Sequence, residues 1–113
     1  LVDHIASCAT ASSPHLIAAE LEALLGAPDL RPGVAELDVP ILLRVGAVDA
    51  AAPVVHSQAI AAVARRAELQ VVPGAGHALL TEDVAATSAA IEAFLVGVQA
   101  ALLPSSRVDR FVT

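Results

Sequence analysis

The sequence is poor in the residue types that build aromatic ligand cages and disulfide-stapled scaffolds. Its 113 residues include no Met, Trp, Tyr or Lys, only two Phe (Phe94 and Phe111) and one cysteine, Cys8. A single cysteine cannot form an internal disulfide, which argues against a small secreted scaffold. The apolar residues, 57% of the chain, are therefore mostly Ala, Leu and Val, which suit close packing of helices on a sheet.

Positive charge is also scarce. Six arginines stand against 12 acidic residues, which gives a formal net charge of -6. This charge would repel the phosphates of nucleic acids and the surface of anionic membranes. We therefore expect neither a nucleic acid nor a membrane among the partners of this chain.

The longest apolar stretch, residues 84–103, is interrupted by polar side chains that are costly to expose to lipid: Thr87, Ser88, Glu92 and Gln99. We interpret it as a helix of a soluble protein. The N-terminal residues lack the cationic segment and apolar run of a signal peptide. These features predict a cytoplasmic protein. Because the chain begins with Leu1 rather than Met, we also expect it to be a fragment.

The first part of the chain carries start and stop signals of a helix over residues 14–25. Ser13 can cap the free N–H groups, Pro14 suits the first helical position, and Gly26 is a plausible stop. Apolar residues recur between them at steps of three and four. Residues 28–33 contain two prolines and a glycine, which predict a connector.

The second part alternates between strand and helix patterns. Residues 39–45 and 69–72 predict two buried strands, and a helix from Pro53 to about Arg66 lies between them. Thr81 can cap a last helix that runs to about Ala101, with one apolar face formed by Ile91, Phe94, Leu95 and Val98. This order implies a right-handed crossover and a parallel sheet. Since two strands cannot bury helices on both faces, we expect more strands outside this sequence.

Two loops follow the predicted strands and contain the candidate catalytic residues, Asp49 and His77. The carboxyl ends of parallel strands share one edge of a sheet, so these side chains could meet there. A carboxylate bonded to one imidazole nitrogen fixes the tautomer and leaves the other nitrogen free to act as a general base. Taken singly, Asp49 could be an Asx-turn residue, and His77 a polar turn residue that follows two glycines.

Other combinations of reactive side chains are weaker. His4, Cys8 and His15 match no compact zinc pattern and lack a fourth ligand, so we expect no metal site. Cys8 also lacks the flanking glycines of a nucleophile elbow, and a buried, unreactive cysteine is the commoner outcome.

Several segments together resemble the C-terminal part of an α/β-hydrolase. They are residues 37–49 (LDVPILLRVGAVD), Pro53, residues 71–77 (VVPGAGH), Glu82-Asp83 and Phe94-Leu95. In that superfamily the acid occupies a Gly-x-x-Asp position, matched by Asp49, and the histidine follows the last strand, matched by His77. The resemblance implies an α/β fold class: the C-terminal part of an α/β-hydrolase fold, with parallel strand-helix-strand-helix order and a preceding lid-like helix.

The same resemblance implies three segments. Residues 1–36 would form a lid and connector that includes the helix at about 14–25. Residues 37–101 would form the C-terminal part of the hydrolase core, and residues 102–113 a tail.

One part of the family pattern is missing. No Gly-x-Ser-x-Gly elbow and no glycine-rich oxyanion loop occur in the sequence, and Val84 stands where many relatives have Pro. We therefore expect this chain to supply Asp49 and His77 to a Ser-Asp-His type triad that hydrolyses small esters or lactones without a cofactor. The missing N-terminal part would supply the nucleophile, and the chain alone would be inactive. The nucleophile is Ser, or Asp as in dehalogenase- and epoxide-hydrolase-like relatives.

An alternative belongs to another functional class. The chain could be a non-catalytic remnant or an interaction module that pairs through the exposed edge of its sheet, with a separate N-terminal half or with itself.

Overall fold

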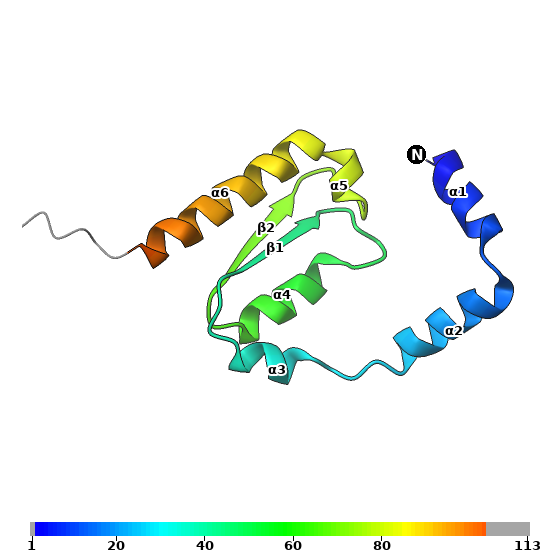
Figure 1. Cartoon of the computed structure of the whole chain (residues 1–113), viewed down its shortest axis with the longest axis horizontal. Coiled ribbons are helices and arrows are strands. Elements are labelled where there is room, and N and C mark those ends of the chain that lie inside the picture. The colour runs from blue at the N-terminus through cyan, green and yellow to red at the C-terminus, as the bar shows by residue number, and fades with distance from the viewer. Residues whose placement is uncertain (1, 104–113) are drawn as a thin grey trace, which may run out of the picture. The chain divides into compact units, whose positions relative to one another are not determined.

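The computed structural model describes residues 2–103 (Figure 1). Phe111 and most of the tail expected at 102–113 lie outside the described residues. The chain divides into two compact units, Leu1–Leu30 and Arg31–Thr113.

The first unit contains two helices, α1 (Val2–Ala11) and α2 (Pro14–Leu25). The Ser13 hydroxyl accepts a hydrogen bond from the Leu16 N–H at 3.2 Å, and the Gly26 N–H donates to the Glu22 carbonyl at 2.9 Å. These two caps place the ends of α2 where the sequence signals predict them. The leucines of α2 are exposed, up to 87% for Leu25. The role of α2 as a lid helix stays a prediction.

The second unit is built around a parallel pair of strands, β1 (Ile41–Gly46) and β2 (Ala67–Val72). Their register runs from Ile41 opposite Ala67 to Gly46 opposite Val72, so both strands end at the same level. The helix between them, α4 (Val54–Val63), lies on one face of the pair, and α6 (Val84–Leu102) lies on the other (Figure 1). Two short helices complete the unit, α3 (Arg31–Glu36) and α5 (Leu79–Glu82).

The expected fold class is wrong. An α/β-hydrolase C-terminal portion requires a sheet of several strands, whereas residues 2–103 form six helices and only two strands. Two of the helices, α1 and α3, lie where the sequence predicted no regular structure. The physical reason is that only two segments carry a strand pattern, and the Ala- and Leu-rich remainder prefers helix.

Few of the described residues are buried. Val45, Ala75 and Thr87 are the buried residues other than glycine among those described. A polar cluster below α6 adds to this small core. The Arg44 guanidinium donates to Gln70 Oε1 at 2.8 Å and to Thr87 Oγ1 at 3.4 Å, and it forms an ion pair with Asp83 at 3.4 Å. These bonds connect β1, β2 and the beginning of α6.

The last helical segment differs from the predicted single helix. The structure has α5 and α6 separated by Asp83, whose backbone is not helical (φ -144°, ψ 63°). Thr81 caps no helix; its hydroxyl donates to the Ala78 carbonyl at 2.9 Å. The break at Asp83 coincides with the ion pair to Arg44.

The apolar residues of α6 are divided between two environments. Phe94 and Val98 are half-buried on the side of the sheet, whereas Ile91 and Leu95 are 40% and 58% exposed. The expected four-residue apolar face is therefore only half covered by the described part of the chain. By length and composition α6 could cross a membrane, and only 6% of its most apolar window is buried.

Candidate functional site

Asp49 lies three residues beyond the end of β1, in the loop that leads to α4. Its Oδ1 accepts hydrogen bonds from the backbone N–H groups of Ala51 at 2.9 Å and Ala52 at 2.8 Å. This is the local turn that a short Asp side chain forms with the backbone after it. The turn holds the carboxylate in place. The Asp49 side chain is only 6% exposed.

His77 follows the turn that ends β2. Gly74 adopts a left-handed backbone (φ 71°), which a residue with a side chain rarely takes, and so lets the chain reverse there. His77 Nδ1 lies 3.0 Å from Asp49 Oδ2 and 3.2 Å from Oδ1. The two side chains thus meet, although 28 residues separate them in the sequence. We call this arrangement the Asp49–His77 pair.

Backbone contacts between the two loops bring the pair together. The Ala47 N–H donates to the Val72 carbonyl at 2.9 Å, and the Val48 N–H donates to the Ala75 carbonyl at 3.0 Å. Gly46 is buried, and its Cα faces the Ala75 and Gly76 backbone so closely that no side chain fits between them. The parallel register and the absence of a side chain at Gly46 therefore determine the approach of the loops.

The geometry fixes the hydrogen-bonding roles of the imidazole. An ionised carboxylate only accepts, so Nδ1 carries the proton in this bond and Nε2 of the neutral ring is left with a lone pair. The His77 side chain is 67% exposed, and no hydrogen bond joins Nε2 to the described residues. This arrangement can accept a proton at Nε2, and the carboxylate can stabilise the imidazolium that results.

Acidification should protonate Asp49 and release it from its turn only at a pH below the usual pKa range of an aspartate. The Ala52 N–H, and then His77, lower the pKa of this carboxyl, while its removal from water acts in the opposite direction. Because the folded-state pKa is lowered, the stabilisation is complete above the unfolded-state pKa and is lost as the pH falls through the folded-state pKa. The amide resonances of Ala51 and Ala52 should titrate with a depressed midpoint; an ordinary aspartate midpoint contradicts this expectation.

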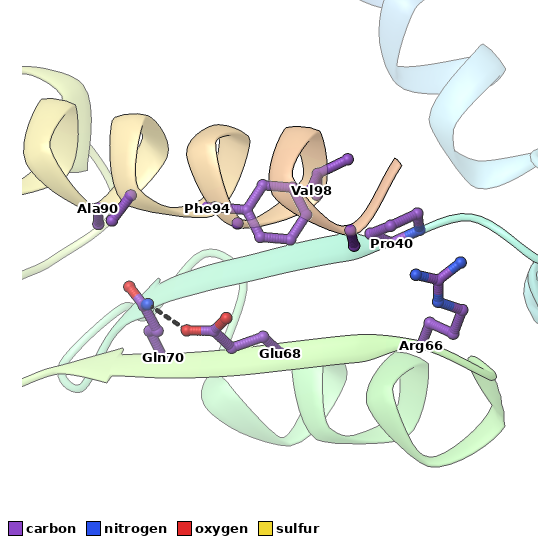
Figure 2. A pocket seen from close by; sticks show the side chains of 10 residues that line it. Pro40, Arg66, Glu68, Gln70, Ala90, Phe94 and Val98 are labelled. Carbon is purple, nitrogen blue, oxygen red and sulfur yellow. Dashed lines mark hydrogen bonds between the residues drawn. The ribbon is translucent and has the colours of Figure 1, made fainter. Parts of the chain in front are cut away.

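Among the described residues, hollows near the strands are lined by residues other than Asp49 and His77. One, of about 350 Å³, lies between β2 and α6 (Figure 2). Arg66, Glu68 and Gln70 form its polar side, and Phe94 and Val98 its apolar side. Figure 2 also shows the 2.6 Å hydrogen bond from Gln70 Nε2 to Glu68 Oε1. The second hollow, of about 420 Å³, adjoins residues 72–75 and is bordered by Glu82 and Asp83.

The remaining candidates do not gather into a site. Within the described residues, no group of three or more His, Cys, Asp or Glu side chains could hold a metal ion. Cys8 is exposed rather than buried, contrary to the expected commoner outcome. Sequence reasoning assigned no role to Glu82, whose carboxylate contacts the backbone on both sides of His77. Its sequence signals are an acid shortly after the histidine and the inclusion of Glu82-Asp83 among the segments that carry the family resemblance.

Comparisons with known proteins show a structural likeness. No family model matches the sequence, and no curated protein matches it. Among solved structures, the chain is similar to one described as a membrane phospholipase A, a novel bacterial virulence factor, with a TM-score of 0.64 and 23% identity. The match covers 68% of this chain and 25% of that one, so the chain matches about a quarter of its neighbour. This distant neighbour is a hydrolase, and the likeness extends to the fold of the matched part.

The prediction of a cytoplasmic protein is also wrong. It rested on the interpretation of residues 84–103 as a helix of a soluble protein and on the lack of signal-peptide features at the N-terminus. The structure instead leaves α6 exposed, with a length and composition that could span a membrane. The structural neighbour is described as a membrane phospholipase A. Of the four polar residues that led to the prediction, Thr87 is buried, whereas Ser88, Glu92 and Gln99 are exposed.

Proposed function

We propose that the Asp49–His77 pair is the acid and base of a hydrolytic site of the kind used by the α/β-hydrolase superfamily. The observation that carries this proposal is the 3.0 Å contact between His77 Nδ1 and a carboxylate that is itself held by two backbone N–H groups. Such a pair combines a fixed tautomer with an accessible Nε2, which are the requirements for a general base.

In the proposed reaction, His77 Nε2 takes the proton from a serine hydroxyl as its oxygen attacks the carbonyl carbon of an ester. Asp49 holds the imidazole in place and stabilises its protonated form. The imidazolium then returns the proton to the departing alkoxide, which leaves an acyl-enzyme. Water, activated by the same Nε2, hydrolyses that intermediate. The scheme requires no metal ion or organic cofactor.

The nucleophile of this scheme would come from polypeptide upstream of Leu1. The sequence contains no Gly-x-Ser-x-Gly elbow, and removing the nucleophile from a comparable triad costs on the order of 10⁶-fold in turnover. The chain by itself is therefore proposed to be inactive. Exposed apolar side chains favour a missing partner surface, because soluble proteins rarely leave large apolar patches uncovered. In the second unit they include Val48, Val55, Val71, Leu80, Val84, Leu95 and Val96.

The proposed substrate class is a carboxylic ester or lactone. The structural neighbour, a phospholipase A, supports inclusion of lipid esters in this class. A panel for the assay would therefore contain short-chain esters, a lactone and phospholipid vesicles.

The reading frame upstream of Leu1 tests the proposal at little cost. An in-frame Gly-x-Ser-x-Gly is the expected result, and an aspartate at the same elbow would indicate the alternative nucleophile. A stop codon close upstream would overturn the catalytic proposal. That outcome would favour the alternative of an interaction module, for which the exposed apolar side chains are the supporting observation.

A further inference from the structure

The imidazole of His77 has little side-chain packing to hold it. It is 67% exposed, and its one hydrogen bond within the described residues joins Nδ1 to Asp49. The position of the ring therefore depends on the backbone that carries it. A displacement of about 1 Å in such a group can cost on the order of 100-fold in rate.

The carboxylate of Glu82 bonds to this backbone on both sides of His77. Oε1 accepts from the Gly76 N–H at 3.2 Å, and Oε2 accepts from the Ala78 N–H at 2.9 Å. Hydrogen bonds from backbone N–H groups to an ionised carboxylate are stronger than those between neutral groups. The carboxylate also lies close against Gly76, where a Cβ atom would meet Oε1 at 3.2 Å.

The other anchor of this turn lies on its upstream side. The Val48 N–H donates to the Ala75 carbonyl and thereby connects the turn to the loop of Asp49. Glu82 holds the turn from the downstream side, at the end of α5. Together the two anchors restrain the backbone before and after His77.

We propose that Glu82 is a positioning residue for His77: by accepting from Gly76 and Ala78 it keeps Nδ1 directed at Asp49. Glu82 does not touch the reacting atoms in this proposal. The proposal rests on the proposed function, since it assigns Glu82 a part in the same site. Substitution of Glu82 should therefore change the tautomer of His77. A purely structural role elsewhere in the chain would not produce this change.

The test uses the full 113-residue chain and the ¹⁵N shifts of the His77 ring at a pH where the imidazole is neutral. The unaltered chain should show Nδ1 protonated. Glu82→Ala should shift the ring toward the tautomer mixture of a free imidazole and speed the amide exchange of Gly76 and Ala78. Glu82→Gln, which keeps one oxygen acceptor, should give an intermediate result. Glu92→Ala, at an exposed position on α6, is the matched control and should leave the tautomer unchanged.

The outcomes separate this proposal from the proposed function of the Asp49–His77 pair. If both Glu82 variants fold by circular dichroism and keep the native tautomer, the positioning role is overturned. In that case Asp49→Asn should still shift the tautomer of His77. If Glu82→Ala does not fold, Glu82→Gln decides. If Asp49→Asn and the unaltered chain share one pattern, the Asp49–His77 pair itself is wrong and both proposals fall. In the complete hydrolase that we propose, Glu82→Gln should lower kcat by up to about 100-fold with little change in KM.

Discussion

Replacing His77 with alanine in the complete hydrolase that we propose should lower kcat for ester hydrolysis by on the order of 10⁶-fold, with little change in KM. His77 is proposed to take the nucleophile's proton and return it to the leaving group, so both chemical steps lose their base or acid. The substitution removes a ring that is 67% exposed, so the loss of packing is small. The measurement is steady-state kinetics on the ester, lactone and phospholipid panel.

His56→Ala is the matched control for this experiment. His56 lies on α4 and is exposed, so its loss should leave kcat unchanged. Equal activity of the His77→Ala variant and the unaltered protein would refute the catalytic assignment. The two candidate nucleophiles also give different results. With serine, no covalent intermediate should form at a useful rate. With aspartate, assayed on an alkyl halide or an epoxide, the carboxylate attacks carbon without a base, so the covalent ester forms and accumulates because no His77 activates the water that would hydrolyse it.

The second large effect concerns Gly46, at the end of β1. A Cβ atom there would collide with the carbonyl oxygens of Ala75 and Gly76 and would lie 2.6 Å from the Ala75 carbonyl carbon. These are backbone atoms, which cannot rotate away as the end of a side chain can. Gly46→Ala should therefore lower the free energy of unfolding by about 3 kcal/mol and separate His77 from Asp49.

Denaturant unfolding and the His77 ¹⁵N shifts measure the two parts of this prediction. Gly97→Ala is the matched control, because a Cβ atom at that exposed position of α6 meets nothing within 4 Å. An alanine inside a helix should stabilise the chain by about 0.5 to 1 kcal/mol relative to glycine. A Gly46→Ala variant as stable as this control would contradict the prediction.

Local sequence signals were sufficient where the interactions are local. Ser13, Pro14 and Gly26 predict the ends of α2 because each acts within one turn of its own position. The helix α3 escaped the same reasoning. Pro32 and Gly33 are typical of a connector, yet Pro is tolerated in the first turn of a helix, where its missing N–H has no partner to lose.

Interactions between distant residues were predicted less completely. The sequence places β2 at 69–72, but the strand begins at Ala67, because Ile41 on β1 supplies a partner there that local strand propensity does not reveal. The expectation of a single helix from Thr81 took no account of Arg44. This residue of β1 forms an ion pair with Asp83, where the helix is interrupted. The exposure of the side chains on α6 could not be predicted from the sequence either, since it depends on what surrounds the helix.

The candidate site shows the same division. Two loops that follow parallel strands must share an edge, so the meeting of Asp49 and His77 could be anticipated from strand order. The two alternatives for Asp49 also turned out to be compatible: one carboxylate forms the local turn and faces His77. Its catalytic role stays a prediction. Glu82 belongs to the segments that carry the resemblance, but its contacts were not predicted because its partners are backbone N–H groups, which no pattern of side chains identifies.

The parallel pairing of β1 and β2 has a consequence for folding kinetics. Every pair in the register joins residues 26 positions apart, from Ile41 with Ala67 to Gly46 with Val72. No turn between adjacent strands can bring such residues together early; the intervening segment, including α4, must first close into a loop. The protonated Nδ1 of His77 should therefore be among the last native signals to appear during refolding. Its ¹⁵N resonance would report when the connection from β1 through α4 to β2 has formed.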